Sequence, residues 1–160
     1  MENAFKVLGA MGLLSLALSA YPQAMPSDHW TREKLLNRAQ NLRQVAAQGD
    51  GSASETLEKY PHHYTMLAFR GRNGGGEIHQ NFADMFTILD GHATLITGGE
   101  VINTKTTAPG EIRGSSVRGG ARQELKGGDV VHIPAGTPHQ MLVAEGKSVT
   151  YFVVKIEESR

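Results

Sequence analysis

The stretch from Gly128 to His139 constrains the fold of this chain more than any other part of its sequence. It reads Gly-Asp-Val-Val-His-Ile-Pro-Ala-Gly-Thr-Pro-His. Val130 to Ile133 is a short β-branched run in which Val131 and Ile133 share one face, and the prolines and glycine after it end the strand. His139 opens the next apolar run, so the direction of its ring is set by the strand that it begins. The stretch therefore predicts one strand, one tight turn and one histidine held in a fixed place.

A second stretch, Gly74 to Gly91, contains residues that could act together with such a histidine. It reads Gly-Gly-Gly-Glu-Ile-His-Gln-Asn-Phe-Ala-Asp-Met-Phe-Thr-Ile-Leu-Asp-Gly. Together, the two stretches resemble the two motifs of the cupin superfamily, G-x5-H-x-H-x3,4-E-x6-G and G-x5-P-x-G-x2-H-x3-N. The second motif matches closely, and departs only where Val143 replaces the usual asparagine.

The first motif matches more loosely. Counting back from Gly91 places Asp84 at the glutamate position, His79 at the second histidine and Glu77 at the first. Cupins that carry the full motif hold a divalent metal with three histidines and a glutamate. Carried over residue by residue, the resemblance implies His79, Asp84 and His139 as metal ligands, with Glu77 as a candidate fourth. It also implies an all-β fold: a small antiparallel β-barrel, the cupin or double-stranded β-helix jelly roll, here preceded by one α-helix.

The chemistry of these residues can also be argued without the resemblance. Glu77 and His79 are two apart, so on a strand both point to the same face, and Asp84 can approach them from the next strand. Two imidazoles and a carboxylate suit iron(II), and they also hold manganese, nickel, cobalt or zinc. Such a metal could polarise a carbonyl or acidify a bound water. Glu77 either binds the metal or acts as the catalytic acid or base beside it.

A barrel that has kept this shape and lost its metal is the alternative. His79 and His139 would then be ordinary core histidines with satisfied hydrogen bonds. Two histidines and two acids at motif spacing favour a metal, because unpaired carboxylates are costly to bury inside a barrel.

The N-terminal residues predict export. Residues 7–20 form an apolar run that is shorter than the roughly 20 residues a membrane span needs, but that suits a secretory signal peptide. The expected division is a signal peptide over residues 1–20, cleaved between residues 19 and 24, a helical extension over 21–60 and the barrel over 61–160. The alternative is an apolar helix that stays attached. The mature protein is expected to be secreted or periplasmic, with no stable membrane span.

Helical and strand periods divide the rest of the chain. Ser27 or Asp28 can cap a helix that ends before Gln48, and the helix could pack on the barrel or on a second subunit. Its apolar residues at helical spacing are Leu35, Ala39, Leu42 and Ala46. Strands are expected from residue 64 onward, with a hairpin turn at Asp90-Gly91 and a long polar segment over residues 98–127.

Composition excludes several classes of function. The 16 Lys and Arg residues balance the 16 Asp and Glu residues, so nothing argues for nucleic acid as a partner. The absence of cysteine excludes disulfides and thiol nucleophiles. The glycine-rich stretches lack a phosphate-loop pattern. The other histidines are expected at the surface or in packing. Three charged residues of the polar segment, Lys105, Arg113 and Arg118, could meet an anionic substrate, but isolated charges on a polar loop are expected to be solvated.

Three classes of function remain. The favoured one is a metal-dependent enzyme acting on a small organic substrate, of the oxygenase, isomerase or lyase type, with Fe, Mn, Ni or Zn as the divalent cofactor. The second is a non-catalytic protein that binds a small molecule such as a sugar or an organic acid. The third is a structural barrel with a degenerate site. A homodimer joined through sheet edges is expected in each case.

Overall fold

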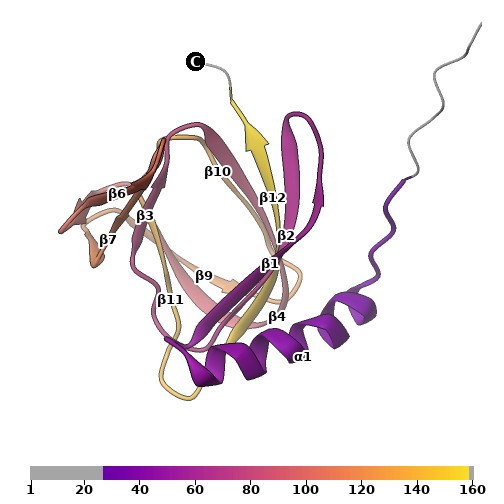
Figure 1. The fold of residues 1–160 in the computed structure, drawn as a ribbon. Coiled ribbons are helices and arrows are strands. Elements are labelled where there is room, and N and C mark those ends of the chain that lie inside the picture. The colour runs from indigo at the N-terminus through magenta and orange to yellow at the C-terminus, as the bar shows by residue number, and fades with distance from the viewer. Residues whose placement is uncertain (1–26, 159–160) are drawn as a thin grey trace, which may run out of the picture.

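The computed structural model describes residues 27–158, which form one helix and an antiparallel sheet curled into a barrel (Figure 1). The helix is α1 (Arg32–Gln48), and the strands are β1 (Ser52–Lys59), β2 (His63–Arg70), β3 (Gly76–His79), β4 (Phe82–Thr97), β5 (Glu100–Ile102), β6 (Lys105–Ala108), β7 (Glu111–Gly114), β8 (Ser116–Arg118), β9 (Ala121–Lys126), β10 (Val130–Ile133), β11 (His139–Leu142) and β12 (Val149–Glu157).

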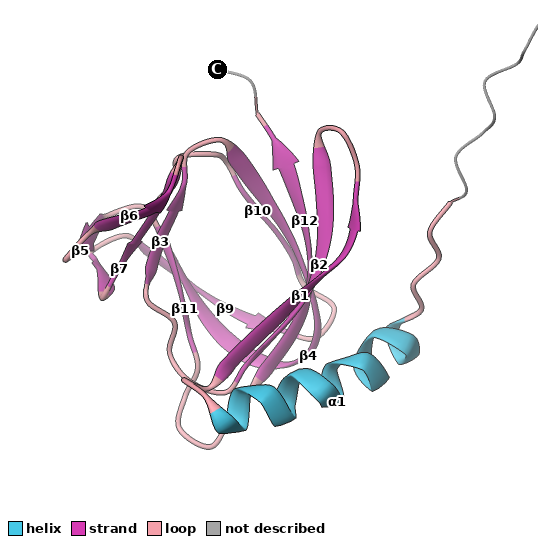
Figure 2. Cartoon of the chain, in the orientation of Figure 1, coloured by secondary structure: helices cyan, strands magenta, loops and turns pink. Residues whose placement is uncertain are grey.

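One ten-stranded sheet makes the barrel, and its strand path is β1-β2-β12-β4-β11-β3-β7-β6. β9 and β10 pair with β4 beside this path, and β5 and β8 form a separate two-stranded sheet (Figure 2). Every strand pair is antiparallel. The expected all-β antiparallel barrel with one preceding helix is therefore confirmed.

The long strand β4 corrects the predicted hairpin turn at Asp90-Gly91. The chain does not reverse there: β4 pairs with β12 before and up to Gly91, and with β9 and β11 after it. Gly91 has a φ of 85°, and a Cβ on it would collide with the carbonyl oxygen of Ser148. The glycine thus serves a close approach of two backbones inside a bent strand, which no short-range pattern distinguishes from a turn.

Side chains alternate between the inside of the barrel and its outer face. Along β2, Ala68 belongs to the core inside the barrel, whereas its neighbour Leu67 belongs to the cluster that packs against α1. β12 repeats the pattern, with Tyr151 inside and Phe152 under the helix. This alternation decides which residues can reach a site inside the barrel.

Helix α1 packs on the outer face of the sheet (Figure 1). The four apolar residues predicted at helical spacing are all buried. The predicted cap at Ser27 or Asp28 is wrong, because the N-cap is Thr31, whose hydroxyl accepts a hydrogen bond from the backbone N–H of Lys34. A side-chain oxygen at this position stabilises a helix by about 1 kcal/mol. Within the described chain no helix is long and apolar enough to cross a membrane.

Strand β1 was not predicted from the sequence. Its residues are largely polar, and only Ala53 and Leu57 pack against the cluster under α1. It pairs with β2 in the register Ala53 to Phe69, so the region over residues 21–60 contains an edge strand as well as the helix. The predicted signal peptide over residues 1–20 lies outside the described residues.

Candidate metal centre

Three neighbouring strands bring the predicted site residues together. Glu77 and His79 lie on β3, Asp84 lies on β4, and His139 begins β11 directly opposite Glu77. The turn of the second motif is also tied to the first, because the backbone N–H of Gly136 donates to the carbonyl of His79 at 2.7 Å. The two motifs therefore meet through backbone hydrogen bonds as well as through their side chains.

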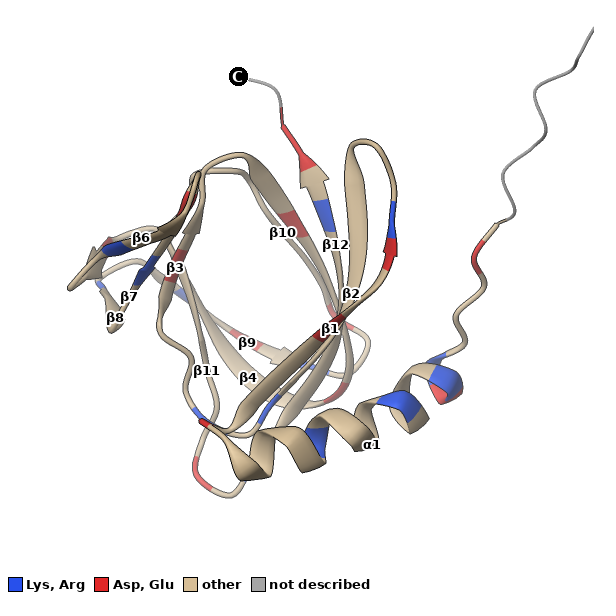
Figure 3. Cartoon of the chain, in the orientation of Figure 1, with Lys and Arg blue, Asp and Glu red and all other residues tan. Residues whose placement is uncertain are grey.

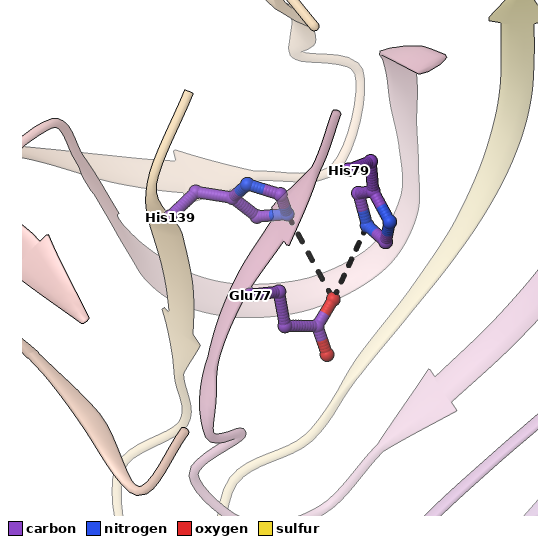
Figure 4. A group of neighbouring side chains, drawn as sticks. All are labelled: Glu77, His79 and His139. Atoms are coloured by element: carbon purple, nitrogen blue, oxygen red, sulfur yellow. Dashed lines mark ion pairs between the residues drawn. The ribbon is translucent and has the colours of Figure 1, made fainter. Parts of the chain in front are cut away.

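Glu77, His79 and His139 converge inside the barrel, and Asp84 approaches the two histidines. His79 Nε2 lies 3.5 Å from both Glu77 Oε2 and Asp84 Oδ2. His139 Nε2 lies 3.8 Å from Glu77 Oε2 and 3.7 Å from Asp84 Oδ2. Figure 4 shows the Glu77 carboxylate facing both imidazole rings, whose centroids are 5.2 Å apart.

Each histidine is held by its other ring nitrogen. Nδ1 of His79 lies 2.7 Å from Oε2 of Glu111, and Nδ1 of His139 lies 3.0 Å from the carbonyl oxygen of Thr137. A carboxylate and a carbonyl only accept hydrogen bonds, so in the neutral imidazoles both protons sit on Nδ1. Both Nε2 lone pairs then point into the site, which is the second-sphere arrangement usual for metal-binding histidines.

This arrangement gathers electron-pair donors with no proton between them. Two Nε2 lone pairs face two carboxylate oxygens, and Nε2 of His139 has no hydrogen-bond partner among the described residues. Buried acceptors facing one another are costly unless a cation lies between them. One ligand atom each from Glu77, His79 and His139 lies within 4.8 Å of the others, so this group could hold a metal ion. The residues present fit a divalent metal.

Burial and neighbouring charges set the ionisation of the site. Burial lowers the pKa of His139, which favours the neutral ring that a metal requires. Burial opposes the ionisation of Glu77, but in acid, where the imidazoles are protonated, a hydrogen bond from His79 and the charges of Arg113, His139 and Arg70 outweigh burial and hold the pKa of Glu77 at about 2. At neutral pH the site therefore offers a carboxylate and a neutral imidazole.

Asp84 faces the two histidines with only one of its carboxylate oxygens. Its Oδ1 forms an ion pair with Lys155 Nζ at 2.5 Å, and both side chains are buried. Its Oδ2 is left facing the two histidines. The shorter aspartate at the motif's glutamate position therefore has one carboxylate oxygen paired with Lys155 of β12. Glu77 is paired as well, because its Oε2 lies 3.3 Å from Arg113.

The site opens into a cavity of about 390 Å³. Glu77, His79 and Asp84 line one part of it, and apolar side chains such as Phe86 line another. Tyr151 also lines it, so both aromatic residues belong to the pocket wall as well as to the barrel core. A small organic molecule could therefore lie next to the convergent ligands.

Sequence reasoning missed four residues around the site: Arg70, Glu111, Arg113 and Lys155. Arg113 was expected to be solvated, and its side chain is 38% exposed, but its guanidinium also contacts Glu77 at 3.3 Å and Glu111 at 2.9 Å. Glu111 reaches His79 because β7 pairs with β3 in the register His79 to Glu111. Lys155 shares the inward face of β12 with Tyr151, a two-residue period that could have signalled it.

Comparison with known proteins shows the fold alone. No family of known sequences matches the chain, and no curated protein matches it. Among solved structures, the cupin domain of Cnp3 from Schizosaccharomyces pombe aligns with a TM-score of 0.51 and 11% identity, over 67% of this chain and 65% of that one. The DMSP lyase DddQ from Ruegeria pomeroyi aligns with a TM-score of 0.50 and 16% identity, over 68% of this chain and 48% of that one. KdgF from a Halomonas species aligns with a TM-score of 0.50 and 13% identity, over 69% of this chain and 84% of that one.

The chain therefore spans about two thirds of the length of the Cnp3 cupin domain structure and about half of the length of DddQ. These neighbours support the cupin fold that the two motifs suggested. One of them, DddQ, is a lyase, but a shared fold does not assign an activity to this chain.

Proposed function

We propose that this protein is a metal-binding cupin whose site acts on a small organic substrate, as an oxygenase, isomerase or lyase. His79, His139 and Glu77 would hold a divalent metal, with Oδ2 of Asp84 as the fourth ligand. The observation that carries the proposal is the convergence of two Nε2 lone pairs and two carboxylate oxygens at the wall of a cavity.

Such a metal would polarise a carbonyl or enolate oxygen of the substrate, or acidify a water. Around it, Phe86 and the other apolar residues of the wall would exclude water from the substrate. Glu77 serves better as a ligand than as a base, because a carboxylate with a pKa of about 2 accepts a proton weakly at neutral pH.

Elemental analysis of protein purified without a chelator or a histidine tag tests the metal. The wild type is expected to carry near-stoichiometric iron, manganese, nickel or zinc, and the double variant His79→Ala/His139→Ala is expected to carry none. His132→Ala is the matched control, since His132 lies exposed on β10. A double variant that retains stoichiometric metal would overturn the proposed site.

Non-catalytic binding of a sugar or an organic acid is the second candidate, because the titratable groups of the cavity are largely paired with one another. Turnover of a carbonyl, enediol or phenolic compound that stops on chelation would identify an enzyme. Thermal stabilisation by such a compound without turnover would identify a binder.

Export and dimerisation remain predictions. The first rests on the apolar run over residues 7–20, and detection of the protein in the periplasm or medium would test it. The second rests on the edge strands β1 and β6 at the two ends of the sheet, and sedimentation at micromolar concentration would test it.

A further inference from the structure

The cavity beside the site is lined by equal numbers of acidic and basic side chains. Its lining contains three carboxylates, from Asp50, Glu77 and Asp84, and three cations, from Arg70, Arg113 and Lys155. Figure 3 shows acidic positions on β3 and basic positions on β7 and β12. The lining is therefore balanced before a metal binds, and a divalent metal would give it a net positive charge. A ligand of this cavity is then favoured if it is an anion.

Arg70 is the cation of the lining whose nearest carboxylate is the most distant. It ends β2, and its side chain is 17% exposed. Its Nη2 lies 3.9 Å from Glu77 Oε1, which is beyond hydrogen-bond distance. Its Nε is buried and has no hydrogen-bond partner among residues 27–158. A buried donor of this kind needs an acceptor, and the guanidinium fork matches a carboxylate with two parallel hydrogen bonds.

Arg70 also remains charged in this setting. Burial alone would lower the pKa of its guanidinium, but Tyr151 and Glu77 outweigh burial, and the pKa is raised. Tyr151 lines the same cavity, and its hydroxyl hydrogen-bonds to Arg70. A guanidinium only donates, so the hydroxyl accepts from Arg70 and keeps its own proton to donate to a ligand.

The other two cations of the lining are already engaged. Arg113 contacts both Glu77 and Glu111, and Lys155 contacts Asp84. Arg70 is therefore the cation that an incoming anion would meet. Glu77 lies between Arg70 and the two histidines, since its Oε1 faces Arg70 and its Oε2 faces the histidines.

We propose that the substrate or ligand is a small organic carboxylate, whose carboxylate pairs with Arg70 and Tyr151 while its adjacent carbon and oxygen atoms lie toward His79 and His139. This inference rests on the proposed metal site and adds the class of compound that the site takes. It assigns to Arg70 the binding of the ligand's charge rather than the binding of the metal.

Matched acids and amides test the inference, because each pair differs in charge but hardly in shape. Metal-loaded full-length protein is titrated calorimetrically with pyruvate, lactate and benzoate, and with pyruvamide, lactamide and benzamide. At least one acid is expected to bind tenfold or more tightly than its amide. Arg70→Gln should abolish that preference, whereas Arg72→Gln, at an exposed arginine two residues along, should preserve it.

Metal content, measured on each sample, separates the two proposals. Metal in the wild type without any preference for acids would overturn the carboxylate inference alone, as would a preference that survives Arg70→Gln. Inorganic phosphate that binds as tightly as the best acid would overturn it too. A wild type that takes up no metal would contradict the proposed function and this inference with it. If Arg70→Gln does not fold, Arg70→Lys and Tyr151→Phe should each weaken binding of the acid severalfold at unchanged metal content.

Discussion

Glu111 holds His79 by its Nδ1 atom at 2.7 Å, and so selects the nitrogen that faces the cavity. The carboxylate is itself held by Arg113 at 2.9 Å. Glu111 takes no part in the convergent group, yet the orientation of a convergent ligand depends on it.

Removing the Glu111 carboxylate should therefore weaken metal binding without removing a ligand. Glu111→Gln is expected to lower metal affinity by about 10- to 100-fold, the usual effect of losing a second-sphere partner. Competition with a chromophoric chelator measures the affinity. Glu145→Gln, at an exposed acid on a distant turn, is the control and should leave the affinity unchanged. Equal affinities in the two variants would contradict the orienting role.

Breaking the buried pair of Asp84 and Lys155 should destabilise the metal-free protein strongly. Lys155→Met leaves Asp84 buried without its cation, and such a loss costs about 3–5 kcal/mol in the free energy of unfolding. Urea denaturation measures it. The double variant Lys155→Met/Asp84→Asn should recover much of the loss, because the uncompensated charge is gone. A double variant as unstable as the single one would show that packing, not charge, is at stake.

Acid should destabilise the metal-free protein in two stages. Burial lowers the pKa of His139 below 6.5, so its contribution is complete above pH 6.5 and is lost as the pH falls through the lower folded value. Glu77, shifted from 4.5 to about 2, contributes fully above pH 4.5 and loses this contribution as the pH falls toward 2. Urea denaturation at pH 7, 5 and 3 should show a decreasing free energy of unfolding. His139→Gln should flatten the step between pH 7 and 5, and a wild type with no such step would refute the assignment.

Gly91→Ala should lower the stability of the folded protein by more than the strain of a positive φ alone explains. Gly91 and Gly128 have φ values of 85° and 97°, but a Cβ on Gly91 would meet the backbone of Ser148, whereas one on Gly128 would meet nothing within 4 Å. Gly128→Ala is expected to lose about 1 kcal/mol through backbone strain, and Gly91→Ala clearly more. Thermal unfolding of both variants compares them. Equal losses would mean that β4 and the Ser148 turn can move apart.

The sequence predicted the parts of the site that lie within one strand or one turn. Glu77 and His79 share a strand face, and the turn before His139 is encoded by its prolines and glycine. Glu111 could not be predicted, because its approach to His79 depends on the pairing of β7 with β3 across a long polar segment. The hairpin turn predicted at Asp90-Gly91 was wrong for the same reason, since Ser148, whose close approach makes the glycine necessary, is far along the chain.

Strand β4 has a consequence for the order of folding. Its first half pairs with β12 and its second half with β9 and β11, so one strand belongs to both walls of the barrel. His79 and His139 become neighbours only after the intervening chain has closed into a loop, which makes this a slow, high-contact-order topology. A nascent chain therefore presents no preformed group of ligands. Under the proposed function, a metal would bind only after closure, in the compartment where the barrel completes its fold.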